Sequence, residues 1–276
     1  MKKISVCILT YNHEKYIESA LKSVINQDVA AIVEVVIGDD LSSDKTRQII
    51  SKIANKSTKM KFKCLFPNKK IGMMNNLIST LAACSGDYIA MLEGDDFWTC
   101  KDKLAKQLLY LEKNTDCAIC FHNVLKISED NLFSPIAMVS KSEGKYSQID
   151  IINENFIPTV SVFFRNNLFK SLPSYFAKLG YGDWFLHIMN SNVGKIGYIK
   201  DLCAVYRVHK NGVTSSSYYS KDSYIANINT TIVMYQKINE YTNYIYDKLI
   251  RKKMKSFKRI LYLKEKKYID YFFTFL

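Results

Sequence analysis

Three carboxylates stand directly after a short apolar run in the first half of the chain. Residues 88–92 are apolar, and Glu93, Asp95 and Asp96 follow them. Such a run, bounded by glycine, is typical of a buried strand, and ligands of open α/β sheets gather beyond the carboxyl ends of such strands. A cluster of oxygen ligands suits Mg²⁺ or Mn²⁺, which accompany diphosphates. The motif alone fits a metal–diphosphate site and a solvated acidic turn equally well.

The residues before this run predict three strand–loop–helix units. The apolar runs at 4–9, 33–37 and 62–66 predict strands, and a helical pattern follows each of them. Either Ser43 or Asp44 is expected to cap the second helix. Strands that alternate with helices form parallel units, so the loops after the strands open on one edge of the sheet. We therefore expect a cleft shared by residues 10–12, 39–40 and 93–96.

The second half of the chain shows a weaker pattern. It predicts a helix over 103–113, strands over 118–124, 160–164 and 204–208, and a short helix that begins at Asp183. Residues 128–146 are polar and irregular, and we expect them to form a mobile loop near the acceptor side. The chain is helical, Tyr-rich and increasingly basic after about residue 220. We expect an α/β domain over 1–220 with a mostly parallel central sheet, and a C-terminal helical extension over 221–276.

The positive charge is concentrated at the C-terminal end. The 276 residues carry a net charge of +13, and the last thirty hold ten Lys and Arg against three acidic residues. A nucleic-acid binder with a cationic surface throughout is therefore disfavoured. The pattern favours a local attraction to an anionic membrane or polyanion.

The cysteines and the N-terminus indicate a cytoplasmic location. The chain has seven cysteines, an odd number, and most lie inside apolar runs, so we expect reduced core residues. Cys117 and Cys120 have no second pair and are interpreted as part of a buried strand and not as a zinc or redox site. The N-terminal apolar run is too short for a signal peptide, and no stretch has the length of a membrane span. The cysteines expected in the core are Cys7, Cys64, Cys84, Cys120 and Cys203.

The motifs together resemble a known family. No GxGxxG or GxxxxGK[ST] follows any predicted strand. The chain instead shows Ile-Leu-Thr-Tyr-Asn, Ile-Gly-Asp-Asp-Leu-Ser-Ser-Asp, Leu-Glu-Gly-Asp-Asp-Phe-Trp, Gly-Asp-Trp and Tyr-Arg-Val-His in this order. From about residue 4 to 215 it resembles glycosyltransferase family 2, the inverting, nucleotide-sugar-dependent enzymes of the GT-A fold, of the type that assembles bacterial capsule, exopolysaccharide or lipopolysaccharide.

The resemblance implies which residues hold the donor. Asp40 matches a position that accepts a hydrogen bond from the nucleotide base, although it is also suited to cap the next helix. Asp95 and Asp96 match the DxD-type element that touches the ribose and an Mn²⁺ or Mg²⁺ ion. Glu93 stands where the family usually has aspartate, so which carboxylates touch the metal stays open, and Asp96 is favoured as the principal ligand. The other implied donor-binding residues are Thr10, Tyr11, Asn12 and Asn76.

The resemblance also implies a catalytic base and a histidine ligand. Asp183 matches the base that takes the proton of the acceptor hydroxyl, with Tyr181 and Trp184 as apolar cover; the alternative is a helix N-cap. Gly182 departs from the Glu that many members have before this Asp. His209 matches a ligand of the metal or the diphosphate, although a lone His is more often structural. His13, His122 and His187 are expected to be structural or surface residues.

The sequence therefore predicts an inverting transferase that moves a sugar from a nucleotide diphosphate, UDP being favoured over GDP or dTDP, to a glycan or lipid-linked acceptor. A nucleotidyltransferase would be expected to carry a Gly-rich, basic phosphate loop after the first strand, and a non-catalytic polyanion-binding module is suggested only by the charge. The basic cluster 251–259 and the aromatic residues after it predict peripheral contact with the inner face of the cytoplasmic membrane. The alternative is a helix packed on the body or at a homodimer interface.

Overall fold

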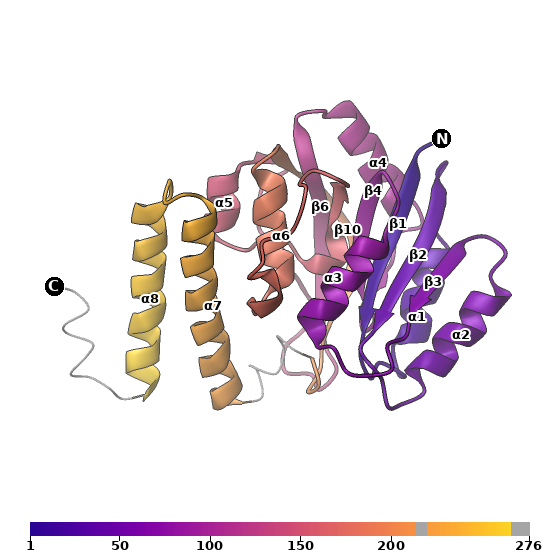
Figure 1. Cartoon of the computed structure of the whole chain (residues 1–276), viewed down its shortest axis with the longest axis horizontal. Helices are drawn as coiled ribbons and strands as arrows, with labels where there is room; N and C mark the ends of the chain where they lie inside the picture. Colours follow the sequence, from indigo (N-terminus) through magenta and orange to yellow (C-terminus); the bar gives the residue numbers. More distant parts are fainter. Residues whose placement is uncertain (213–219, 266–276) are drawn as a thin grey trace.

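The chain folds around one mixed β-sheet. The computed structural model describes residues 1–212 and 220–265. In this part the main strand order is β3-β2-β1-β4-β9-β6-β10-β5, with β7 added to β6 and β8 added to β10. Helices cover both faces, and the last two helices stand side by side at one end of the molecule (Figure 1). The α/β architecture with a central sheet and flanking helices expected from the sequence is confirmed.

The first half of the sheet is parallel, as the sequence predicts. It consists of β1 (Lys3–Thr10), β2 (Ile32–Asp39), β3 (Lys61–Leu65) and β4 (Tyr88–Glu93). In the register, Thr10 lies beside Asp39, and Leu9 lies beside Glu93. The carboxyl ends of these strands therefore meet at one sheet edge, and the polar loops that follow them open there.

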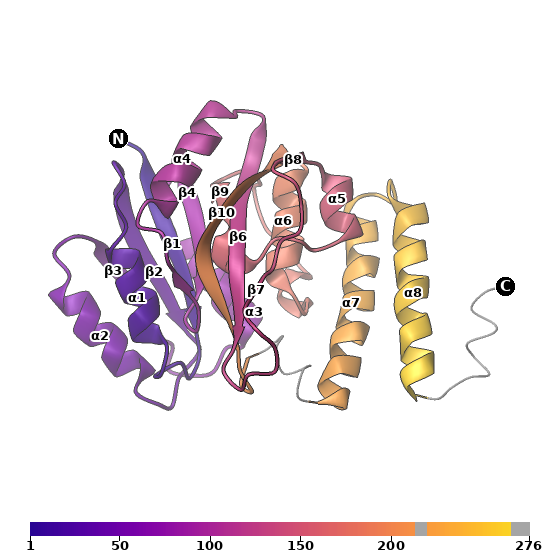
Figure 2. The same cartoon turned by 180° about the vertical axis from the view of Figure 1, so that it is seen from behind.

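Two groups of helices bury their apolar stripes on opposite faces of the sheet (Figure 2). One face carries α1 (Ile17–Ile25), α2 (Thr46–Lys56) and α4 (Lys103–Lys113). The other carries α3 (Met73–Ala83) and α6 (Gly182–Ser191). Asp44, one of the two predicted caps, accepts a hydrogen bond from the Thr46 backbone at 2.9 Å, but the N-cap of α2 is Lys45 and no side chain caps this helix, so the predicted cap by Ser43 or Asp44 is wrong.

The second half of the sheet departs from a parallel pattern. The short strand β9 (Phe163–Arg165) runs antiparallel between β4 and β6 (Cys117–Ser128). The strand β10 (Lys195–Val208) pairs in parallel with β6 and begins earlier than the strand predicted over 204–208, because its pairing with β6 starts at Lys195. Antiparallel to the end of β10 lies β5 (Phe97–Trp98).

The segment between β6 and α6 is more ordered than we expected. It contains β7 (Ile136–Ala137), β8 (Gly144–Tyr146), α5 (Gln148–Asn153) and two short 3-10 turns at Thr159–Ser161 and Phe176–Lys178. The expectation of an irregular loop over 128–146 is therefore wrong in part, because backbone pairing with β6 and β10 orders stretches that carry no apolar signal.

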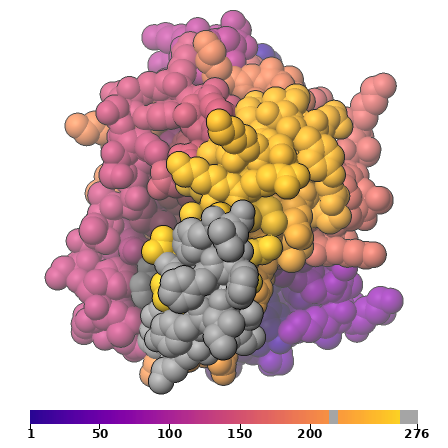
Figure 3. All heavy atoms as spheres, turned by 90° about the vertical axis from the view of Figure 1, so that its left-hand side faces the viewer, coloured from indigo at the N-terminus to yellow at the C-terminus, as the bar shows by residue number. Residues whose placement is uncertain are grey.

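The C-terminal helices share the core of the body. Helices α7 (Lys221–Tyr241) and α8 (Asp247–Glu265) pack against each other at the end of the molecule beyond α6 (Figures 1 and 3). Met234, Ile238 and Ile250 are fully buried in the same apolar cluster as Phe185 of α6. Over the described residues α8 therefore packs on the body, in agreement with the alternative of a packed helix. The aromatic residues 268–276 lie outside the described residues.

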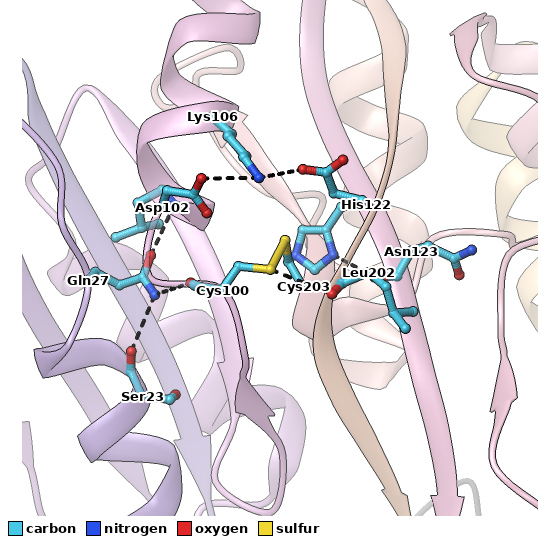
Figure 4. The surroundings of a disulfide bond; sticks show 11 residues. Ser23, Gln27, Cys100, Asp102, Lys106, His122, Asn123, Leu202 and Cys203 are labelled. Atoms are coloured by element: carbon cyan, nitrogen blue, oxygen red, sulfur yellow. Dashed lines mark hydrogen bonds and ion pairs between the residues drawn. A yellow bond between two sulfur atoms is a disulfide. The ribbon is translucent and has the colours of Figure 1, made fainter.

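One expectation about the cysteines is wrong. Cys100 and Cys203 form a disulfide (Figure 4). The antiparallel pairing of β5 with β10 brings the two Cα atoms to 4.8 Å, which suits a disulfide, although 103 residues separate them in the chain. That proximity depends on tertiary structure and has no local sequence signal. The cysteines that remain free are Cys7, Cys64, Cys84, Cys117 and Cys120.

Cys117 and Cys120 lie buried on β6, as expected. The Cys117 thiol contacts the Asp116 carboxylate, and the Cys120 thiol contacts the Gln107 carbonyl. The two thiols thus bond to different neighbours. In the described ranges 1–212 and 220–265, no helix has the length and apolar character needed to cross a membrane.

Candidate active site

A large cavity opens at the carboxyl edge of the parallel strands. Its volume is about 1040 Å³, and it extends from the loop after β1 to α6, α7 and α8. The structure thus brings together residues from Leu9 to Ile260, which are far apart in the chain. Of the residues predicted from the sequence, the cavity is lined by Thr10, Tyr11, Asp40, Asn76, Glu93, Asp95, Asp96 and Asp183.

The end of β1 supplies one wall of the cavity. Thr10 is buried, and its hydroxyl has no hydrogen-bond partner in the described part of the chain. Tyr11 is 39% exposed, and the Lys70 ammonium lies 3.8 Å from the centre of its ring. Asn12 does not line the cavity; its side-chain oxygen accepts a hydrogen bond from the Ser43 backbone at 2.8 Å. Asn12 therefore ties the β1 loop to the β2 loop, while Tyr11 faces the cavity.

Asp40 fixes the loop that begins α3. One carboxylate oxygen accepts hydrogen bonds from the backbones of Ile71 and Gly72, at 2.8 and 2.9 Å. The alternative that Asp40 caps the next helix is wrong, because the N-cap of α2 is Lys45 and no side chain caps that helix. Asp40 is 4% exposed and still lines the cavity, so it retains a carboxylate edge for a ligand.

Asn76 reaches the cavity because a glycine stands opposite it. Its amide nitrogen donates to the Gly38 carbonyl at 2.8 Å, and its side-chain oxygen is buried without a partner among the described residues. A Cβ atom on Gly38 would lie 2.4 Å from that oxygen. The Gly38 that follows the apolar run of β2 is thus needed for this close approach.

The acidic loop after β4 holds three carboxylates in different environments: Asp96 is buried, whereas Glu93 and Asp95 are partly buried. Burial raises the pKa of Glu93, and the charges of Asp95 and Asp183 raise it further, to about 8. Burial, followed by the charges of Asp95 and Glu93, raises the pKa of Asp96 well above its ordinary value. Burial alone would raise the pKa of Asp95, but the hydrogen bond with His209 and the charge of His13 lower it. Asp95 is therefore the carboxylate best prepared to be ionised.

The end of β10 holds the acidic loop in place. Asp96 accepts a hydrogen bond from the Arg207 backbone at 2.8 Å, and the Arg207 guanidinium donates to the Asp95 carbonyl. The guanidinium also lies 4.4 Å from the centre of the Phe97 ring and 5.3 Å from that of Tyr16. Arg207, which belongs to the Tyr-Arg-Val-His motif, therefore positions the acidic loop.

Two histidines face Asp95. Oδ2 of Asp95 lies 3.0 Å from Nε2 of His209 and 3.7 Å from Nε2 of His13. His13, expected to be a structural or surface residue, is mostly buried beside Asp95 and lines the cavity; its place directly after the predicted donor residues was the available signal. His122 and His187 are fully buried within the body, in agreement with a structural role.

The acidic loop offers atoms that suit a divalent metal. One oxygen of Glu93 and one of Asp96 are buried with no hydrogen-bond partner in the described part of the chain. Carboxylate oxygens with one imidazole suit Mn²⁺, and oxygens alone suit Mg²⁺. In residues 1–212 and 220–265, no three acidic, His or Cys side chains already converge on one point. The residues therefore fit a metal whose coordination is completed by a ligand's oxygens.

Asp183 faces the same cavity from the first turn of α6. Its carboxylate accepts a hydrogen bond from the Thr159 hydroxyl at 2.8 Å. The alternative of a helix cap is wrong, because the N-cap is Tyr181 and no side chain caps this helix. Burial, followed by the charge of Asp183, raises the pKa of Tyr181 to about 12. Tyr181 and Trp184 both line the cavity, so they supply the apolar cover that we expected.

The packing of α6 on α3 explains why Gly182 precedes Asp183. A Cβ atom at this position would lie 2.4 Å from the Leu77 side chain and 2.8 Å from that of Met74. A larger residue would push the start of α6 away from α3. The glycine therefore sets the place from which Asp183 enters the cavity.

The fold and the site define a class of protein. A solved structure of TarS from Staphylococcus aureus in complex with UDP-GlcNAc superposes with a TM-score of 0.64 at 21% identity, over 87% of this chain and 67% of that one. A mannosyltransferase from Pyrobaculum calidifontis in complex with GDP-Man and Mn²⁺ superposes with a TM-score of 0.61 at 17% identity, over 86% and 64%. At these identities the likeness establishes the GT-A fold.

The sequence comparisons then establish the family. The family model "Glycosyl transferase family 2" matches residues 5–173, more than half of the chain, so the chain belongs to this family. An uncharacterised protein of Mycobacterium tuberculosis is 34% identical over 220 residues, which are 78% of this chain and 61% of that protein. A Campylobacter jejuni protein named GalNAc(5)-diNAcBac-PP-undecaprenol beta-1,3-glucosyltransferase is 29% identical over 81% of this chain and 70% of its own length. The chain thus spans about 61% of the mycobacterial relative.

Proposed function

We propose that this protein is an inverting glycosyltransferase of bacterial surface polysaccharide synthesis. It moves a sugar from a nucleotide diphosphate to a hydroxyl of a glycan or lipid-linked acceptor. The observation that carries the proposal is the single cavity, which the acidic loop after β4 and the carboxylate of Asp183 both line. Family membership and the named relatives support the same reaction.

The donor nucleotide occupies the wall formed by the β1 loop and the loop before α3. Tyr11 offers an exposed ring, Lys70 a cation and Asp40 a carboxylate, on one side of the cavity. Such a set suits a base that stacks and presents a ring N–H. We favour UDP, because the relative TarS was solved with UDP-GlcNAc and the Campylobacter relative is a glucosyltransferase.

Asp183 acts as the general base in this proposal. It takes the proton of the acceptor hydroxyl while that oxygen bonds to the anomeric carbon. The bond from this carbon to the diphosphate breaks, and the electron pair leaves with the diphosphate on the opposite face. One displacement inverts the configuration. A base must lie within reach of the proton that it takes, and the Thr159 hydrogen bond holds the carboxylate in position.

The metal would be held by Asp96, Asp95 and His209. An Mn²⁺ or Mg²⁺ ion bound there would neutralise negative charge on the departing diphosphate. The buried, unpartnered oxygen of Asp96 supports its place as principal ligand. Glu93, whose pKa is raised to about 8, is suited to donate a hydrogen bond beside the ionised Asp95.

We also propose that α8 contacts the anionic inner face of the cytoplasmic membrane, where a lipid-linked acceptor resides. The face of α8 opposite the cavity carries six basic residues at helical spacing, and Figure 3 shows this end of the molecule. Basic residues near an anionic surface attract it. We call this set the basic stripe: Lys248, Arg251, Lys252, Lys255, Lys258 and Arg259.

A thermal-shift panel tests the proposed function. The protein is melted with UDP-, GDP- and dTDP-sugars, each with Mn²⁺ and with a chelator, because a ligand that binds only the folded state raises the melting temperature. We expect a UDP-sugar with Mn²⁺ to give the largest rise. Equal melting temperatures in every sample would contradict the proposal.

A further inference from the structure

The active-site cavity continues beyond Asp183 along the C-terminal helices. Its lining residues on α7 and α8 recur every three or four positions, so each helix turns one face to the cavity. The other face of α8 carries the basic stripe. We call the cavity-facing set the helical wall: Tyr224, Asn227, Ile228, Thr231 and Tyr235 from α7, and Lys253, Ser256, Phe257 and Ile260 from α8.

A row of aromatic rings leads from the proposed base to α8. The ring of Trp184, next to Asp183, meets the Tyr235 ring edge-on at 5.1 Å between centroids. The Tyr235 ring lies 5.9 Å from that of Phe257. These contacts form a continuous row of three rings from α6 to α8, and the polar residues Asn227, Thr231 and Ser256 also line the cavity.

The helical wall carries one charged group. Lys253 is partly buried, lines the cavity, and has no ion-pair partner among the described residues. The acidic loop lines the same cavity on the side of the sheet. The cavity thus has an acidic side, which suits a metal-bound donor, and a side formed by the helical wall with Lys253; Glu154 also lines the cavity and pairs with Lys141 at 2.8 Å.

We infer that the helical wall is the acceptor subsite, and that it takes a sugar joined through a phosphate group to a hydrocarbon chain. This inference rests on the proposed function. The sugar lies beside Asp183, the hydrocarbon packs on Ile228, Phe257 and Ile260, and Lys253 pairs with the phosphate. A polyol phosphate would share the anion but would leave these apolar side chains without a partner, so the lipid-type acceptor fits better.

Calorimetry with three soluble probes tests the subsite. Farnesyl phosphate carries both the hydrocarbon and the anion, farnesol only the hydrocarbon, and ribitol 5-phosphate only the anion. UDP and Mg²⁺ are present at saturation so that the donor site is filled. We expect farnesyl phosphate to bind at least about tenfold more tightly than either of the others, since a charge-assisted contact and apolar burial both contribute.

Neighbouring substitutions on α8 provide matched controls. Lys253→Glu should weaken farnesyl phosphate binding by about tenfold or more, whereas Lys252→Glu, on the basic stripe, should leave it unchanged. Ile260→Asn should weaken it as well, and Leu263→Asn, at an exposed position, should not. UDP affinity and melting temperature, measured for all four variants, should match the unsubstituted protein.

The outcomes separate this inference from the proposed function. Equal binding by the Lys253→Glu and Lys252→Glu proteins would overturn the subsite. Ribitol 5-phosphate binding as tightly as farnesyl phosphate would overturn the lipid-type class and point to a polyol phosphate. If the unsubstituted protein did not bind UDP, the donor site and with it the proposed function would be contradicted.

Discussion

Nε2 of His209 lies 3.0 Å from the outer carboxylate oxygen of Asp95, although 114 residues separate the two in the chain. The contact joins the loop after β4 to the end of β10. Asp95 also lies near His13, so two imidazoles face its carboxylate. Burial and the neighbouring carboxylates disfavour the ionised forms of the adjacent Glu93 and Asp96. The acidic loop is thus arranged to accept a cation.

Asp96→Asn should remove metal-dependent donor binding without unfolding the protein. Asn resembles a neutral carboxyl group, which is the form favoured at Asp96 in the metal-free protein. Mutations of groups that only orient metal ligands already cost about 10–100-fold in affinity, so the loss should be at least this large. Calorimetry with UDP and Mn²⁺ measures it. Asp201→Asn, at a surface position of β10, is the control, and equal affinity in both variants would place the metal elsewhere.

Asp183→Asn should leave donor binding nearly intact while transfer falls by about 10²-fold or more, the effect of losing a positioned proton acceptor. Thr159→Val removes only the hydrogen bond to this carboxylate and should cause a smaller loss. Rates are measured at saturating donor and acceptor. Transfer by Asp183→Asn near that of the unsubstituted protein would exclude Asp183 as the base, and a product with retained anomeric configuration would exclude the single displacement.

The stability of the metal-free protein should fall as the pH rises from about 4.5 to about 8. Over this window Glu93 holds its proton in the folded state, where its pKa is about 8, and loses it in the unfolded state, where the ordinary value is 4.5. The unfolded state then binds fewer protons, so the free energy of unfolding decreases with rising pH.

Glu93→Gln should weaken this pH dependence and raise the melting temperature at pH 8 relative to the unsubstituted protein. Melting curves at pH 5 and pH 8, recorded with chelator, measure the difference. Glu112→Gln, at a partly exposed position of α4, serves as the control. An identical pH dependence in the Glu93→Gln and unsubstituted proteins would show that Glu93 is ionised in the folded state.

The basic stripe should bind the protein to anionic vesicles. Each Lys or Arg near such a surface contributes about 1 kcal/mol, and the attraction is screened by salt. Sedimentation with phosphatidylglycerol vesicles should therefore carry the protein down at low salt but not at high salt. Reversing Lys248, Lys252 and Lys258 to Glu should abolish this. Protein that remains in the supernatant at low salt would refute the membrane contact.

The sequence predicts the parallel half of the fold well because β1, β2 and β4 are mostly apolar and a helical pattern follows each of the first three strands. It also places Asp40, the acidic loop and Asp183 at one site, since each follows a predicted strand or begins a predicted helix. The direction of β9 and the extension of β10 back to Lys195 depend on pairing with β6, so the strands predicted over 160–164 and 204–208 do not show them. The contact of His13 with Asp95 and the place of Lys253 on the cavity wall could not be predicted for a related reason, because the residues around them come from elsewhere in the fold.

The disulfide ties together the two segments that bear the facing Asp95 and His209. Cys100 lies five residues after Asp95, and Cys203 lies six residues before His209. Fluctuations that separate β5 from β10 are limited by this covalent link, so the acidic loop and the end of β10 should open to solvent as one cooperative unit. Amide hydrogen exchange in the two segments is therefore expected to follow the same opening free energy while the disulfide is intact, and to diverge after its reduction.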